Sequence, residues 1–470
     1  MGATQLLTRH VIENSAYDLL PAGVVATAKE MMLNAAAAAL AAAAQPDGQR
    51  ITQFVQEMGG NGKCTIIGRG LRSSPVYAAL ANGLMVHLLD FDDVIIPNGV
   101  HPSCTVFPVV MALGEMNGAT GRDVLAAFVQ GCEVTSKLAG LLFQANPPRA
   151  TSPSGGWHAD AIAGTIGATV AAGLLLGLSQ EQLERALGIA AGQASGIQAN
   201  RFTAARALQC GSAAMNGVMA TRLSQQGLSG ARNALESAGG WAALFSTENQ
   251  QTGQEIGEEL VRLLSWSWDI HDPGVTLKLY PCHIAGHTAI DAALQLAQLH
   301  RTEAGPGPGI DPSQMVKVQV SITPAAMAEL PIAAPQNGWE ARFCASYIVA
   351  VALLHGHPLI DFFSDSALED REVRAFMDRI SVEATQPASG IAPYPSTVSI
   401  ELENGQLIQQ RTDFARGQPQ LPLEQQELDA KFLYCSRYIL PPDHIEEAID
   451  SFRGLEYIEN ITGMASVLGG

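Results

Sequence analysis

The segment HLLDFDDVIIPNGVHPS at residues 87–103 gathers ionisable side chains between two apolar runs. Its ionisable residues are His87, Asp90, Asp92, Asp93 and His101. A buried carboxylate costs on the order of several kcal/mol unless it is paired or protonated. A helix ending near Asp93 would place His87, Asp90 and Asp93 on one face. The segment is therefore predicted to line a cavity with acid–base groups, although Asp92 and Asp93 alone could equally cap an element or form ion pairs.

Two further segments place a polar side chain at the start of a helix rich in small residues. His158 begins HADAIAGTIGATVAAGLLLGL, where the exposed helix N–H groups favour an anion and lower the pKa of an imidazole. Taken alone, a histidine there is more often a structural cap. Arg201 and Arg206 precede CGSAAMNGVMA, and a forked guanidinium suits anion recognition, whereas a solvated helix face is the plainer alternative.

The fourth segment is TLKLYPCHIAGHTAIDAAL at residues 276–294. His283, His287 and Asp291 recur at intervals of four, which would place them on one helical face with the spacing of metal ligands. No HExxH motif accompanies them, so no metal is predicted. Lys278 and His283 at a helix entrance better suit carboxylate binding or acid–base chemistry. Tyr280 between them is a candidate substrate-binding residue.

The composition excludes several classes of function. The chain has 470 residues, 47% of them hydrophobic, and a formal net charge of −18. This predicts a soluble protein of two domains that binds neither nucleic acid nor anionic membranes, while a local pocket can still be basic. The seven scattered cysteines and the absence of an evident signal peptide predict reduced thiols in the cytoplasm and no structural zinc. The apolar run at 34–44 is too short to span a bilayer and predicts a packed helix.

The elements that must position these side chains change type along the chain. Helical periodicity dominates residues 1–275, whereas strand patterns follow at 315–322, 380–385 and 396–414. The last pattern turns at Asn404-Gly405, a strong hairpin signal. Helical patterns at 285–300 and 339–355 lie among these strands. The prediction is a mainly α fold: a large all-helical domain from residues 1–275 and 411–470, with a smaller α+β lid inserted at 276–410.

Together these segments resemble the MmgE/PrpD family, which includes 2-methylcitrate dehydratase, cis-aconitate decarboxylase and iminodisuccinate epimerase. The matching pieces are NGLMVHLLDFDD…HPS, GWHADAIAGTIGATVAAGLLLGLS, CGSAAMNGVMA, KLYPCHIAGHTAIDA and EARFCASYIVAVAL. The resemblance implies a cofactor-free homodimer with the active site between its two domains. It also implies a small anionic polycarboxylate as substrate.

Residue by residue, the resemblance implies site roles for Asp90, His101, His158, Lys278 and His283. His101 and His158 would be the acid–base groups, Asp90 would orient an imidazole, and Lys278 and His283 would bind carboxylates. Arg206, Tyr280 and Asp93 are further substrate-binding candidates.

The chain also departs from the decarboxylase pattern. Val94 replaces a threonine, Arg206 a lysine and Gln209 a histidine. A lid tyrosine has no clear counterpart near residues 326–338. These departures weaken the decarboxylase interpretation specifically.

The predicted chemistry is removal and return of a proton at a carbon next to a carboxylate. Two imidazoles suit an epimerase of the iminodisuccinate type, which the sequence favours slightly. The alternatives are a lyase, resembling either the dehydratase or the decarboxylase, and a non-catalytic protein that binds dicarboxylates. The shared presence of the five site residues argues against the binding protein.

Overall fold

The computed structural model describes residues 2–59, 62–143, 156–245, 253–303, 310–387 and 392–470. The chain folds into two compact units. The helical unit contains Met1–Leu88, Asp92–Leu277 and Glu424–Gly470, and the inserted unit contains Leu89–Phe91 and Lys278–Leu423. The predicted fold class is thus confirmed: both chain ends build a large helical unit, and a smaller α+β unit is inserted between them.

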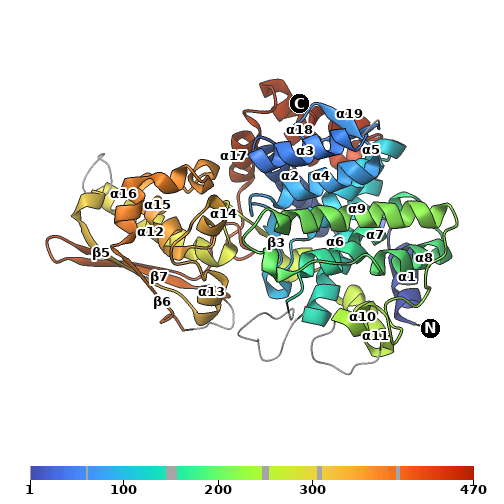
Figure 1. Ribbon diagram of the computed structural model, residues 1–470, viewed down its shortest axis with the longest axis horizontal. Coiled ribbons are helices and arrows are strands. Elements are labelled where there is room, and N and C mark those ends of the chain that lie inside the picture. The colour runs from blue at the N-terminus through green and yellow to red at the C-terminus, as the bar shows by residue number, and fades with distance from the viewer. Residues whose placement is uncertain (1, 60–61, 144–155, 246–252, 304–309, 388–391) are drawn as a thin grey trace. The chain divides into compact units, whose positions relative to one another are not determined.

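Long helices with many small residues form the centre of the helical unit (Figure 1). These helices are α2 (Ala22–Ala43), α4 (Pro75–His87), α5 (Pro102–Asn117), α6 (Gly121–Phe143), α7 (Ala159–Leu175) and α9 (Ala205–Gln225). The helix α9 packs on α4 and α7, and α7 also packs on α5 and α6. Alanine and glycine at the contacts let these helices approach closely, because few side-chain atoms separate the backbones.

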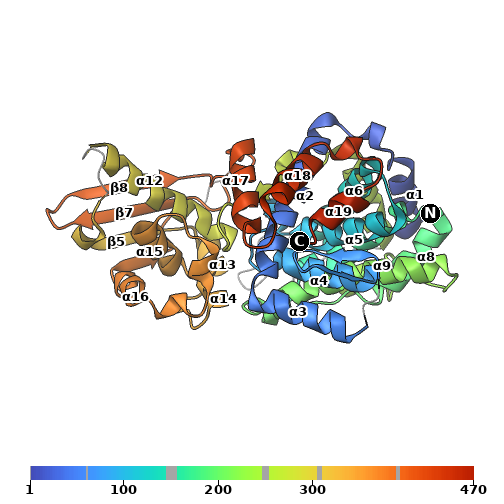
Figure 2. The same ribbon diagram turned by 90° about the horizontal axis from the view of Figure 1, so that it is seen from above.

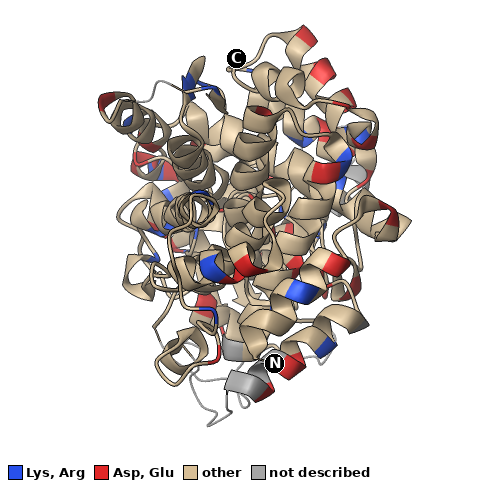
Figure 3. Cartoon of the chain, turned by 90° about the vertical axis from the view of Figure 1, so that its right-hand side faces the viewer, with Lys and Arg blue, Asp and Glu red and all other residues tan. Residues whose placement is uncertain are grey.

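Shorter elements surround this centre. They are α1 (Ala3–Glu13), α3 (Pro46–Glu57), α8 (Gln180–Ala191), α10 (Trp241–Phe245), α11 (Gly253–Trp266), and the two small ladders β1 (Cys64–Ile66) with β2 (Leu71–Ser73) and β3 (Asp93–Val94) with β4 (Thr276–Leu277). Charged residues of both signs occur along the outer helices, and the inner helices carry few (Figure 3).

The C-terminal helices return to the N-terminal part of the chain. They are α17 (Gln425–Ser436), α18 (Pro442–Arg453) and α19 (Thr462–Val467). Both α17 and α18 pack on α2, and α19 packs on α5, as the red and blue segments of Figure 2 show.

The apolar run at 34–44 belongs to α2, which already begins at Ala22. By length and composition this helix could cross a membrane, but 78% of its most apolar window is buried inside the structure. It packs on α4 and α17, and every residue from Met31 to Ala43 is buried. In this structure α2 is therefore a core helix.

The inserted unit is built on a four-stranded sheet of order β6–β5–β7–β8. Its strands are β5 (Met315–Ser321), β6 (Ile380–Glu383), β7 (Ser396–Leu402) and β8 (Leu407–Thr412), and only the β5–β6 pair is parallel. The predicted hairpin is present: β7 and β8 pair in register at Ile400 and Ile408, and Gly405 turns between them with φ 81°.

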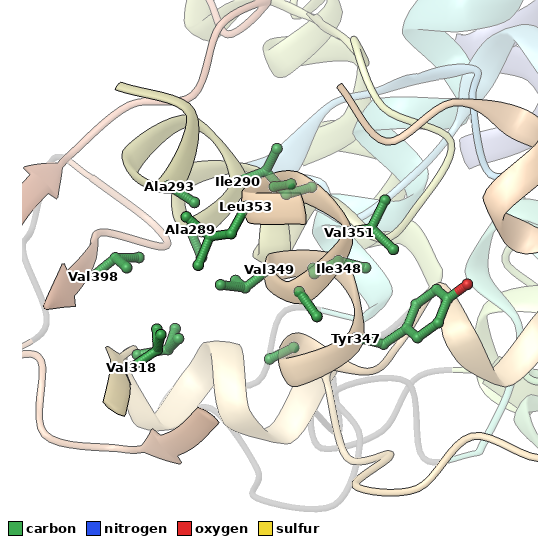
Figure 4. Close-up of a cluster of buried hydrophobic side chains, with 14 of the residues drawn as sticks. Ala289, Ile290, Ala293, Val318, Tyr347, Ile348, Val349, Val351, Leu353 and Val398 are labelled. Atoms are coloured by element: carbon green, nitrogen blue, oxygen red, sulfur yellow. The ribbon is translucent and has the colours of Figure 1, made fainter. Parts of the chain in front are cut away.

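Helices cover the apolar face of this sheet (Figure 4). The two that contact its strands are α12 (His287–Glu303) and α15 (Ala345–His355). The shorter helices of the unit are α13 (Pro324–Glu329), α14 (Gly338–Ala341) and α16 (Arg371–Met377), of which α16 packs on α15. Ala289 and Ala293 on α12 and Val349 on α15 face Val318 and Val398 of the sheet. The core of the unit lies between these two layers.

Two local predictions about helices were wrong. The first helix of the 87–103 segment ends at His87, six residues before the predicted end, and Asp90 adopts a left-handed φ of 50°. His87, Asp90 and Asp93 therefore do not share a helix face. Likewise, His283 precedes a 3₁₀ turn (Ile284–Gly286) and α12 begins only at His287, so His283 lies outside that helix.

Candidate active site

The contact between α4 and α9 brings His87 to Arg206. A Cβ on Gly211 of α9 would lie 2.3 Å from the Leu80 carbonyl oxygen of α4, and one on Gly83 would lie 2.9 Å from the Gly211 Cα. The two backbones thus touch near the end of α4 and the start of α9. One turn further along, Arg206 Nε donates a hydrogen bond to His87 Nε2 at 3.1 Å.

The Asp92 carboxylate lies between two imidazoles. Its Oδ2 is 2.8 Å from His87 Nδ1, and its Oδ1 is 3.4 Å from His101 Nδ1. Burial would by itself raise the pKa of Asp92, but the two histidines lower it well below its usual range. Asp92 is therefore ionised; it fixes the His87 ring by a hydrogen bond and faces the His101 ring at a longer distance.

Asp160, in the first turn of α7, contacts the backbone of His101 and the ring of His158. Its Oδ1 accepts a hydrogen bond of 2.6 Å from the His101 backbone N–H, and its Oδ2 is 3.0 Å from His158 Nε2. Burial again opposes ionisation, yet His101 and His158 hold the pKa of Asp160 far below normal. His158 is the N-cap residue of α7, as predicted, but its ring is turned to Asp160 and caps no backbone N–H.

The three imidazoles converge in a buried place. The ring centroids of His87 and His101 are 4.8 Å apart in an edge-to-face contact, and those of His87 and His158 are 6.1 Å apart. Each of the three side chains is at most 5% exposed. Six residues, all of the helical unit, form what we call the acid–base cluster: His87, Asp92, His101, His158, Asp160 and Arg206.

Burial lowers the pKa of His158, against the opposing influence of Asp160. Among the described residues neither ring nitrogen has a hydrogen bond of good geometry, although Nε2 lies 3.0 Å from Asp160 Oδ2 and only Nδ1 is without a close polar partner. A neutral imidazole with one unengaged nitrogen is equipped to take up a proton at neutral pH.

His87 experiences opposing influences. Burial and the Arg206 cation disfavour its charged form, but Cys210 and Asp92 outweigh them and raise the pKa of His87 to about 9. The hydrogen-bond geometry nevertheless decides the protonation state of the ring: Arg206 Nε–H donates to Nε2, so that nitrogen must carry a lone pair. In the conformation of the structure His87 is therefore neutral, with its proton on Nδ1 toward Asp92.

The cluster also includes atoms spaced like metal ligands. One set is His87, His158, Asp160 and Cys210, and the other is His87, Asp92 and His101, with ligand atoms within 4.8 Å of one another in each. Both sets need His87, whose two ring nitrogens face Asp92 and the Arg206 cation. A guanidinium directed into the cluster disfavours a metal cation there, so these donors suit proton transfer better.

Asp90 and Lys278 form a buried ion pair in the inserted unit. Lys278 Nζ contacts Asp90 Oδ1 and also donates to the Asp90 carbonyl at 3.2 Å. Lys278 is fully buried. Asp90 is the one residue other than glycine with positive φ in the described chain, and such strain is typical of functional sites. Asp90 was predicted to orient an imidazole; the structure pairs it with the Lys278 ammonium group, whereas Asp92 and Asp160 face the imidazoles of the cluster.

The other candidates of the inserted unit have separate partners. His283 Nε2 is 3.5 Å from Glu329, whereas His287 Nε2 lies 3.2 Å from the Cys282 carbonyl. The Tyr280 hydroxyl donates to Asp291 at 2.6 Å, and burial raises the pKa of that carboxyl to about 6. His283, His287 and Asp291 thus do not converge on a common ligand position.

Asp93 lies in the helical unit, on β3 opposite Leu277. Burial and Asp92 raise the pKa of Asp93 to about 7, while hydrogen bonding from Ser103 works against them. Its position facing Ser103, at the start of α5, fits the alternative that it supports the loop between α4 and α5.

The structure brings together three of the predicted site residues in the helical unit, His101, His158 and Arg206, and pairs Asp90 with Lys278 in the inserted unit. Asp160 was missed altogether. A usable signal existed, because an aspartate two residues after a helix-capping histidine can reach that histidine from the first turn.

Comparison with known proteins identifies the family of the chain. A sequence model of the MmgE/PrpD N-terminal domain matches residues 8–254, and one of the C-terminal domain matches residues 280–456. The chain belongs to the MmgE/PrpD family. The resemblance inferred from the motifs is thereby confirmed.

The curated relatives of this family member are decarboxylases by name. The chain is 29% identical to cis-aconitate decarboxylase of Mus musculus over 95% of this chain and 90% of that protein. It is 28% identical to the Homo sapiens protein over 89% and 85%, and 26% identical to the Aspergillus terreus protein over 98% and 94%. These relatives favour the lyase interpretation over the slight preference for an epimerase.

Proposed function

We propose that this MmgE/PrpD enzyme is a lyase that removes carbon dioxide from a small unsaturated polycarboxylate of the cis-aconitate type. The observation that carries the proposal is the pair of buried imidazoles, His101 and His158, held by ionised Asp92 and Asp160 beside the Arg206 guanidinium. The names and full-length coverage of the relatives support the same choice.

The proposed reaction needs one proton and a place for negative charge. The bond between the methylene carbon and its carboxyl breaks, and its electron pair forms a new C=C bond. The former vinylic carbon takes a proton, so a tricarboxylate and one proton give itaconate and carbon dioxide. His101 or His158 would deliver the proton. Arg206, Lys278 and His283 would bind carboxylates, with Asp90 holding Lys278.

A second candidate is the epimerase of iminodisuccinate type. The observation that favours it is that the two imidazoles are held by two different carboxylates, so each can act as a separate proton site. An epimerase needs such a pair, because it removes a proton from one face of a carbon and returns one to the other.

Proton NMR in D₂O separates these functions. Chelator-treated enzyme is given cis-aconitate, iminodisuccinate stereoisomers or 2-methylcitrate in separate samples. The proposal predicts itaconate with a single deuterium on the methylene next to a carboxylate. Interconverted, deuterated stereoisomers of iminodisuccinate would establish the epimerase instead, and a dehydrated product of 2-methylcitrate would establish the dehydratase.

Two variants test the assigned residues in the same assay. His101→Asn and His158→Asn should each lose at least about 100-fold in turnover, since a positioned acid–base group contributes roughly that much. Intact turnover in both variants would contradict the assignment. No conversion of any of the three acids by the wild-type chain would contradict the proposed function and favour a binding protein.

A further inference from the structure

His87 is the one imidazole of the cluster whose two nitrogens both have partners of known type. Asp92 Oδ2, an acceptor, is 2.8 Å from Nδ1, and Arg206 Nε, a donor, is 3.1 Å from Nε2. Because arginine only donates hydrogen bonds, Nε2 holds a lone pair as long as this contact persists. The Arg206 guanidinium thus prevents protonation of His87 at Nε2, although the Asp92 carboxylate at Nδ1 would favour a charged ring.

The charges around His87 leave room for one more proton. The groups that face the cluster are Asp92 from the loop after α4, His101 at the start of α5, His158 and Asp160 at the start of α7, and Arg206 and Cys210 on α9. Two carboxylates are ionised and only one group is permanently cationic. In a buried site an uncompensated negative charge is costly, so the cluster favours protonation.

Arg206 is also the cation in this cluster best suited to a substrate carboxylate. It stands in the first turn of α9 and is 9% exposed, whereas His87 is 1% exposed. An incoming carboxylate competes with the neutral His87 ring for the guanidinium. The carboxylate is the better acceptor, because it is an anion and can bind the guanidinium through two parallel hydrogen bonds, whereas the neutral ring offers a single lone pair.

We propose that His87 is a proton store controlled by Arg206: a substrate carboxylate draws the guanidinium away, and the freed Nε2 takes up the proton that the reaction consumes. Asp92, whose two oxygens face the two rings, connects this store to His101. His87 is thus a positioning residue that acts through His101 and not by touching substrate. This inference rests on the proposed function, because it requires a polycarboxylate ligand.

Calorimetry with tricarballylate, the saturated analogue of cis-aconitate, tests the proposal without turnover. Binding is measured at pH 8 in buffers of different ionisation enthalpy, which gives the number of protons taken up. Once Arg206 has left, the ring has a free Nε2 and still faces the Asp92 carboxylate through Nδ1, so it should take up close to one proton per site. His87→Gln should bind without this uptake, and the matched control His355→Gln, at an exposed histidine, should keep it.

The free protein gives a second measurement. In nitrogen NMR of ¹⁵N-histidine-labelled protein at pH 8, His87 of the wild type should show one protonated and one unprotonated nitrogen. Arg206→Gln should show both nitrogens protonated before any ligand is added.

Three outcomes would count against these ideas, and they are distinguishable. Tricarballylate binding without proton uptake, or uptake that persists in His87→Gln, would overturn the proton store alone. A neutral His87 in Arg206→Gln would do the same. Failure of tricarballylate to bind the wild type would contradict the polycarboxylate function, and the proton store with it.

Discussion

Asp160 has the most consequential contacts of any single residue in the cluster. One of its oxygens holds the His101 backbone, and the other faces the His158 ring. The carboxylate therefore sets the position of both candidate acid–base groups without needing to touch a substrate. A residue of this kind controls geometry and charge at once, and the two contributions can be separated by an isosteric change.

Asp160→Asn should lower kcat by roughly 100-fold or more while KM changes little. The amide keeps the shape of the side chain but removes the charge that favours a protonated His158. Steady-state kinetics with the substrate identified by NMR measure the effect. Asp443→Asn, at an exposed aspartate on α18, is the matched control and should retain wild-type kcat. A kcat close to wild type in Asp160→Asn would show that Asp160 is only structural.

For single residues, the sequence predicted which side chains belong to the site better than it predicted which side chains contact one another. His158 at a helix start and the burial of the 87–103 carboxylates follow from local pattern, and both are present. The partner of Asp90 does not follow, because it depends on a backbone turn at φ 50° and on Lys278, 188 residues away. Asp160 was overlooked for the same reason: its contact to His101 is also long-range.

The pairing of α4 with α9 shows how elements fix the cluster. Gly83 and Gly211 remove the side chains that would otherwise separate the two helices. Arg206 lies about one turn before Gly211 on α9, and His87 lies about one turn after Gly83 on α4. The distance between His87 and Arg206 therefore depends on a contact between backbones.

Gly211→Ala should damage both stability and activity. The new Cβ would lie 2.3 Å from the Leu80 carbonyl oxygen, so the helices must move apart. Overpacking of this kind costs about 1–3 kcal/mol of unfolding free energy. It should also lower kcat by at least about 10-fold, since small displacements of catalytic groups are costly.

Thermal unfolding and steady-state kinetics measure the two effects of Gly211→Ala. Gly463→Ala in α19 is the control, because a Cβ there meets nothing within 4 Å. If Gly211→Ala had normal kcat despite a lower melting temperature, close approach of α4 and α9 would not be what positions the cluster.

Elements with a strong local signal were predictable, and their ends were not. The hairpin around Asn404-Gly405 was found because its turn residues and strand alternation agree. The end of α4 was misplaced by six residues, since no glycine or proline marks it and Asp90 makes the turn itself. The spacing of His283, His287 and Asp291 suggested one helical face, but a 3₁₀ turn before His287 removes His283 from it.

At the scale of the whole molecule, the acidic excess is only partly at the surface. The helical unit also buries a second charged network in which α6 holds the loop that contains Asp269. Glu133 accepts backbone hydrogen bonds from Asp269 and Ile270 at 2.9 and 3.0 Å, and Lys137 pairs with Asp269. Asn98, in the loop before His101, also donates to Asp269 at 2.9 Å. This network ties the His101 loop to α6.

Glu133 should make the stability of the molecule depend on pH. Burial and Asp269 raise its pKa from 4.5 to about 7, against the influence of Lys137. The folded chain therefore binds this proton more tightly than the unfolded chain does. The resulting stabilisation is fully present below about pH 4.5 and is lost as the pH rises through about 7.

Glu133→Gln cannot ionise, and its amide oxygen can accept one of the two backbone hydrogen bonds. Loss of the other bond lowers the stability of the variant by an amount that does not depend on pH. We compare the unfolding free energy of the variant with that of the wild type at each pH. This difference should shift in favour of the variant by up to about 3 kcal/mol from pH 5 to pH 8, because only the wild type loses the contribution of Glu133. Urea unfolding of both proteins at the two pH values measures the difference. Asp93, whose pKa is raised to about 7 as well, titrates in both proteins, so its contribution cancels in the comparison.

Glu447→Gln, at an exposed glutamate on α18, is the control and should show the same difference from wild type at both pH values. If Glu133→Gln also did so, Glu133 would be ionised throughout, and Lys137 would have to neutralise two buried carboxylates at once.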